Sequence, residues 1–66
     1  HPDAEQRLRG AHQVAQMLLT VDAADTVRAW FIGMNPQLDD EAPLNEIAAG
    51  NTKAVIGAAR SFILGA

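Results

Sequence analysis

Residues 29–38 of the sequence read AWFIGMNPQL, and the helix end and turn within this segment set the path of the chain. Trp30 belongs to an apolar helix face, and Gly33 follows where a left-handed residue is expected to end that helix. The dipeptide Asn35-Pro36 then requires a turn, because the residue before a proline is pushed out of the helical region. We therefore predict a helix, then a tight single-turn element at 34–38, and a new chain direction after it.

Helical periodicity continues on both sides of this turn. Apolar residues three and four positions apart predict helices at about 3–19, 23–32, 43–49 and 53–64, whereas no segment alternates with the period of a strand. We expect Asp22 to cap the second helix, Pro43 to open the third, and Gly50 to end it. The sequence thus predicts an all-α fold, a small bundle of about four helices with a short third helix after the Asn-Pro turn.

The direction of each apolar face follows from the same spacing. In the leading helix, which occupies the unit 1–21, one stripe is expected to face the bundle: Leu8, Ala11, Ala15, Leu18 and Leu19. Val14 and Met17 widen this stripe. In the third helix, Leu44 and Ile47 are expected to point inward. Gly10 weakens the leading helix by about 1 kcal/mol relative to alanine. Two interpretations of Gly10 stay open, a close helix contact and no role.

Composition limits the possible functions. The chain has 66 residues, a formal charge of -3, no cysteine and 13 alanines, so the units 1–21 and 22–66 are expected to form one compact domain. The negative charge argues against a grip on a phosphate backbone. The apolar runs are far shorter than the ~20 residues that span a bilayer. We therefore expect a soluble, cytoplasmic module with no membrane partner.

No pattern of residues indicates catalysis, and we predict that the chain is not an enzyme and holds no cofactor and no metal. The acidic run 39–41 lacks the ligand alternation and glycine of a calcium loop. His12 has no acidic residue placed to orient its ring, and Ser61 has neither a glycine elbow nor a basic partner.

The adjacent pair Trp30-Phe31 is the most informative feature outside the turn. Neighbouring positions of a helix cannot both face one narrow core, so one ring is expected in the core and the other beneath a neighbouring helix or a partner protein. Aromatic residues are favoured anchors of protein interfaces. Plain core is the favoured interpretation, and an interface is the alternative.

Three segments in this order resemble the C-terminal toxin-binding domain of the Xre/MbcA/ParS antitoxins. They are the segment Ala29–Leu38, the string Ala42-Pro43-Leu44-Asn45-Glu46-Ile47 followed by Gly50, and Val55 with Ala58-Ala59-Arg60-Ser61-Phe62. The similarity covers roughly 22–62. One departure is the run 39–41, because the family usually carries glycine between its Asn-Pro turn and its Pro-Leu step.

The resemblance implies a bacterial type II toxin–antitoxin system, in which the domain covers the active site of a RES-domain toxin that consumes NAD. DNA would then be bound only through an N-terminal domain outside this sequence, and a homo-oligomer is expected. The residues expected to contact the partner are Trp30, Phe31, Met34, Asn35, Pro36, Arg60, Ile63 and Leu64.

Two alternative functions remain beside this one. The chain could be a homo-oligomerisation module of a transcription regulator without a toxin. A helix-turn-helix that binds DNA ranks last, because the third helix, 43–49, offers no arginine or lysine to a base. The uncharged end 63–66 either packs on a partner or is a frayed terminus.

Overall fold

The computed structural model describes residues 2–65 and confirms the all-α fold. Its elements are α1 (Pro2–Leu19), α2 (Ala24–Ile32), the 3-10 turn η1 (Pro36–Leu38), α3 (Pro43–Ala48) and α4 (Thr52–Leu64). The predicted turn after Asn35 and the short third helix are both present. Residues 1 and 66, at the outer ends of the predicted units, lie outside the described residues. None of the helices within 2–65 is long and apolar enough to cross a membrane.

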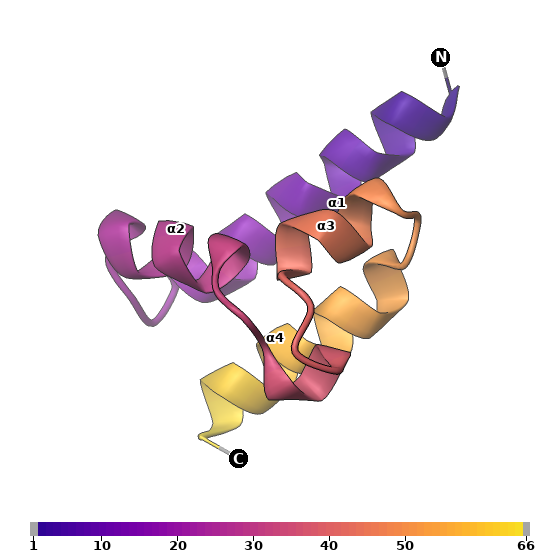
Figure 1. Cartoon of the computed structure of the whole chain (residues 1–66). Coiled ribbons are helices and arrows are strands. Elements are labelled where there is room, and N and C mark those ends of the chain that lie inside the picture. Colours follow the sequence, from indigo (N-terminus) through magenta and orange to yellow (C-terminus); the bar gives the residue numbers. More distant parts are fainter. Residues whose placement is uncertain (1, 66) are drawn as a thin grey trace.

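The long helix α1 contacts every other helix of the bundle. Helices α2, α3 and α4 all pack against it, α3 also contacts α2 and α4, and η1 packs on α4. Figure 1 shows α1 running across the molecule, with α2 at its C-terminal end and its first turns extending beyond the other helices. The molecule measures 34 × 24 × 17 Å along its principal axes.

The core is assembled from small and branched side chains of every helix. Its buried members are Val14, Leu18, Val27, Leu38, Ile47, Val55, Ala58 and Ala59. Gly10 lies where α1 meets the start of α4, and a Cβ atom at Gly10 would come within 2.6 Å of the Thr52 Cγ2 atom. Of the two interpretations of Gly10, the close helix contact is therefore the correct one.

Two apolar side chains predicted to face the bundle are directed elsewhere. Leu8 is 73% exposed and Leu19 is 45% exposed, whereas Val14 and Leu18, also on the predicted apolar face, are fully buried against the other helices. The apolar arc of α1 is wider than the surface that a bundle of this size can cover. Leu44, also predicted to point inward, is 48% exposed.

The connections differ from the prediction in their caps. Helix α2 begins at Ala24, one residue later than expected. Its N-cap residue is Ala23, which makes no side-chain hydrogen bond, so the prediction that Asp22 caps the helix is wrong. The Asp22 amide instead donates to the Leu18 carbonyl at 3.0 Å and closes α1. Gly33 is extended, with φ −84° and ψ 159°, so the predicted left-handed end of α2 is wrong. A positive φ occurs at Gly50, which follows α3 as expected, and also at Asp39 and Asp40.

Candidate functional site

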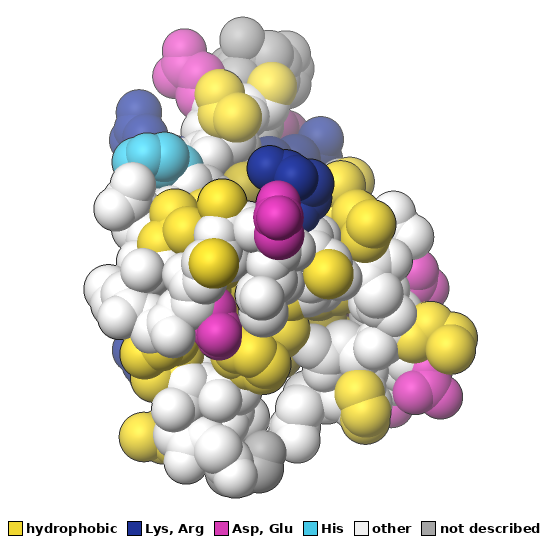
Figure 2. Space-filling model, turned by 90° about the vertical axis from the view of Figure 1, so that its left-hand side faces the viewer, with side chains coloured by type: hydrophobic (Ala, Val, Ile, Leu, Met, Phe, Trp, Pro, Cys, Tyr) yellow, Lys and Arg dark blue, Asp and Glu magenta, His cyan; other side chains and the backbone are white. Residues whose placement is uncertain are grey.

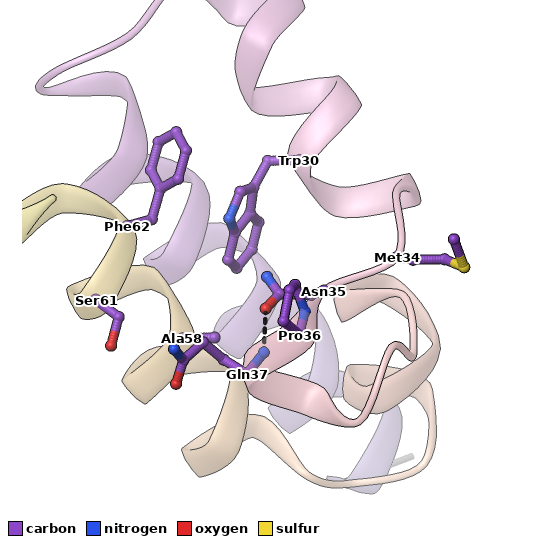
Figure 3. Close-up of a pocket in the computed structure, with 8 residues that line it drawn as sticks. All are labelled: Trp30, Met34, Asn35, Pro36, Gln37, Ala58, Ser61 and Phe62. Atoms are coloured by element: carbon purple, nitrogen blue, oxygen red, sulfur yellow. Dashed lines mark hydrogen bonds between the residues drawn. The ribbon is translucent and has the colours of Figure 1, made fainter. Parts of the chain in front are cut away.

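A cleft of about 270 Å³ opens between α2, the η1 turn and α4. Its lining residues come from all three elements and are Trp30, Met34, Asn35, Pro36, Gln37, Ala58, Ser61 and Phe62. Figure 3 shows the Trp30 indole directed into the space between the Phe62 ring and the Asn35-Pro36 turn. The cleft thus forms where the end of α2 and the Asn35-Pro36 turn meet α4.

All three aromatic residues of the chain gather at this cleft or directly behind it. The Trp30 ring lies 5.4 Å from the Phe31 ring in an edge-on arrangement and 6.3 Å from the Phe62 ring, measured between centroids. Trp30 and Phe31 are both half-buried and both pack against the core. One ring was expected in the core and the other beneath a neighbouring helix or a partner; in the structure neither ring belongs to the buried core, and both pack against it.

Asn35 builds the floor of the cleft. Its side-chain Oδ1 atom accepts a hydrogen bond from the Gln37 amide at 2.9 Å, which caps the η1 turn. Its carbonyl oxygen accepts from the amides of Leu38 and Asp40, each at 2.9 Å. With only 8% of its surface exposed, Asn35 holds the loop in shape and offers little surface to a partner.

Of the remaining predicted contact residues, Met34 lies at the rim of the cleft, whereas Arg60, Ile63 and Leu64 do not line it. Met34 is 82% exposed, and Figure 3 shows its side chain pointing away from the cavity. Leu64 is 80% exposed in the last turn of α4, where Gly65 closes the helix in left-handed conformation. Ile63 is half-buried against the core, and Arg60 is exposed and does not line the cleft. Ala66, the last residue of the predicted apolar end, lies outside the described residues.

Four lining residues escaped the predicted set: Gln37, Ala58, Ser61 and Phe62. A signal for three of them was present, since Ala58, Ser61 and Phe62 are three and four positions apart and share one helix face. Gln37 carried no such signal, because its place at the cleft depends on how η1 packs on α4.

The chemistry of the cleft suits binding. Its lining combines aromatic, aliphatic, amide and hydroxyl groups, and no residue in that lining is acidic or basic. Among residues 2–65 no group of three or more histidine, cysteine, aspartate or glutamate side chains is placed to hold a metal ion. A half-open aromatic cleft of this kind can accept an apolar side chain of another molecule.

Apolar side chains also reach the surface beyond the cleft. Figure 2 shows several clusters of hydrophobic side chains on the face that carries α2, separated by polar surface and a few charged groups. Ile32, which is 67% exposed, belongs to α2.

No family model, curated protein or solved structure matches the chain.

Proposed function

We propose that this chain is a protein-binding module that neutralises a RES-domain, NAD-consuming toxin by covering its active site in the bacterial cytoplasm. The observation that carries the proposal is the aromatic cleft, in which Trp30 is half-buried and Phe62 is 40% exposed. The resemblance of the segments around Trp30, Pro43 and Phe62 to the Xre/MbcA/ParS antitoxins supports the choice of partner.

Neutralisation by coverage requires surface contact and no chemistry. An apolar side chain of the toxin would enter the cleft and pack on the Trp30 and Phe62 rings, which supply large contact area at a small cost in conformational entropy. Met34 and Leu64 are exposed apolar side chains on the same two elements that bear the cleft, the turn after α2 and the end of α4. They would extend the contact and exclude water around the rings.

The test uses the full chain and the RES-domain protein encoded next to its gene. Added in equimolar amount, the chain should abolish the loss of NAD that the purified toxin causes, and co-expression of the two proteins should restore growth. A neighbouring gene that encodes no such toxin, or NAD loss that proceeds unchanged with excess chain, would contradict the proposal.

Paired variants locate the contact. We expect Met34→Ser to raise the inhibition constant roughly tenfold, as for a residue that packs beside the anchor residue of an interface. The melting temperature should stay unchanged, because the Met34 side chain is 82% exposed. Leu8→Ser is the matched control, since Leu8 is 73% exposed but belongs to α1, which does not line the cleft. Equal effects of the two substitutions would place the contact elsewhere.

A further inference from the structure

The two methionines of this chain, Met17 and Met34, carry all of its sulfur, because the sequence has no cysteine. A methionine thioether is oxidised to the sulfoxide, and an accessible sulfur atom reacts before a covered one. Oxidation at sulfur therefore falls on one of these two residues, and their surroundings decide which.

The surroundings of the two side chains differ. Met34 is 82% exposed, and Figure 3 shows its sulfur atom turned away from the other side chains that line the cleft. Met17 is half-buried and packs against the hydrophobic core. A small oxidant dissolved in water thus reaches the sulfur atom of Met34 first.

The backbone on both sides of Met34 is held in place. The Gly33 amide donates to the Ala29 carbonyl at 3.0 Å, and Asn35 is buried, with only 8% of its surface exposed. A sulfoxide oxygen on Met34 would therefore lie in water and leave the fold intact. The same oxygen on Met17 would lie against the core, where a polar group without a hydrogen-bond partner is costly.

Met34 also borders the surface that the proposed function uses. It lines the aromatic cleft together with Trp30 and Phe62, and its thioether is a polarisable apolar group that packs well against other side chains. Oxidation makes this side chain polar, so a partner that covers it must remove water from the new oxygen. The change that leaves the fold intact therefore weakens contact at the cleft.

We propose that Met34 is a peroxide-sensitive modification site, at which oxidation to the sulfoxide reversibly weakens the binding of a partner to the aromatic cleft. The weakened binding rests on the proposed function, whereas the preference of peroxide for Met34 does not. In the reaction, the Met34 Sδ lone pair attacks one oxygen of hydrogen peroxide, the O–O bond breaks and an S–O bond forms. The proton of the transferred oxygen passes to the departing hydroxide, which leaves as water, so sulfur loses two electrons and peroxide gains them.

Peptide mass spectrometry of the full chain after brief treatment with hydrogen peroxide tests the site. We expect the sulfoxide to accumulate several-fold faster at Met34 than at Met17, and the chain oxidised at Met34 alone to keep its melting temperature. Treatment in urea is the control, because unfolding exposes both side chains and should bring the two rates together. Equal rates in the folded chain, or a lower melting temperature after oxidation of Met34 alone, would overturn the proposal.

Inhibition of the proposed RES-domain toxin tests the consequence of oxidation. The chain is oxidised first, catalase removes the peroxide, and only then is the toxin added, so the toxin itself is never oxidised. We expect the inhibition constant to rise roughly tenfold, as for the loss of a contact beside an interface anchor. Treatment of the oxidised chain with a methionine sulfoxide reductase should restore the original value.

Two leucine variants assign the effect to one sulfur atom. Met17→Leu, a volume-conserving change outside the cleft, should lose inhibition on oxidation as the unaltered chain does. Met34→Leu should show the same inhibition constant before and after peroxide treatment. If the oxidised chain inhibits as well as the untreated one, or if Met34→Leu stays sensitive to peroxide, the inference is refuted and the proposed function stands. An untreated chain that fails to inhibit refutes the proposed function and, with it, the consequence of oxidation.

Discussion

At the scale of single residues, Gly10 fixes the distance between α1 and α4. A methyl group there would meet Thr52 Cγ2 at 2.6 Å, whereas one at Gly57, in the middle of α4, would meet nothing within 4 Å. Both positions are helical, so both gain about 1 kcal/mol in propensity when glycine becomes alanine.

We therefore expect Gly57→Ala to raise the free energy of unfolding by about 1 kcal/mol. Gly10→Ala should be less stable than Gly57→Ala by about 1–3 kcal/mol, the usual cost of overpacking. Urea denaturation measures both. Adding Thr52→Ala to Gly10→Ala should recover most of the loss, because the closest side-chain atoms are then gone. Equal stability of the two alanine variants would show that the helices are free to move apart.

The Asn35-Pro36 turn shows which structural features of single residues can be predicted from the sequence. Asn35-Pro36 correctly indicated a break in the helix, because the steric effect of proline is local. The burial of Asn35 could not be predicted, since it follows from η1 packing on α4. Asp39 and Asp40 adopt φ values of 54° and 65°, so this loop takes left-handed geometry without the glycines usual in the family it resembles.

At the scale of helices, positions were easier to predict than faces. The predicted helix at 53–64 matches α4 (Thr52–Leu64) within one residue, because caps and breakers are local signals. The inward face of α1 was predicted in part, because alanine-rich helices have apolar arcs too wide to single out one line. Leu18 and Val14 of the predicted face are fully buried, whereas Leu8 is not.

The uneven burial of α1 predicts uneven stability along it. Residues 3–9 of α1 are all exposed, whereas the second half of the helix carries Val14 and Leu18 into the core. In dilute solution, amide hydrogen exchange followed by NMR should therefore be much faster in the first two turns than around Val14. Equally slow exchange along the whole of α1 would contradict the burial described for this helix.

At the scale of the whole molecule, the chain presents two apolar surfaces on different helices. The aromatic cleft lies between α2 and α4, and the exposed Leu8 on α1 borders a shallow depression beside α3. The sequence analysis named Trp30 and Phe31 as core residues or possible contact residues, but it did not predict that Trp30 and Phe62, which are 32 positions apart, would share a cleft. Contacts so distant along the chain depend on the packing of the complete bundle.

Trp30 is the sole tryptophan of the chain, so it reports on the cleft alone. The most direct test is fluorine NMR of the full chain labelled with fluorotryptophan, titrated with the proposed partner, a RES-domain toxin that the proposal expects to be encoded beside its gene. We predict that the single resonance shifts or broadens until one equivalent is bound, in step with the loss of NAD consumption. A resonance that stays in place while the toxin is fully inhibited, or after excess toxin is added, would contradict the claim that this cleft binds the partner.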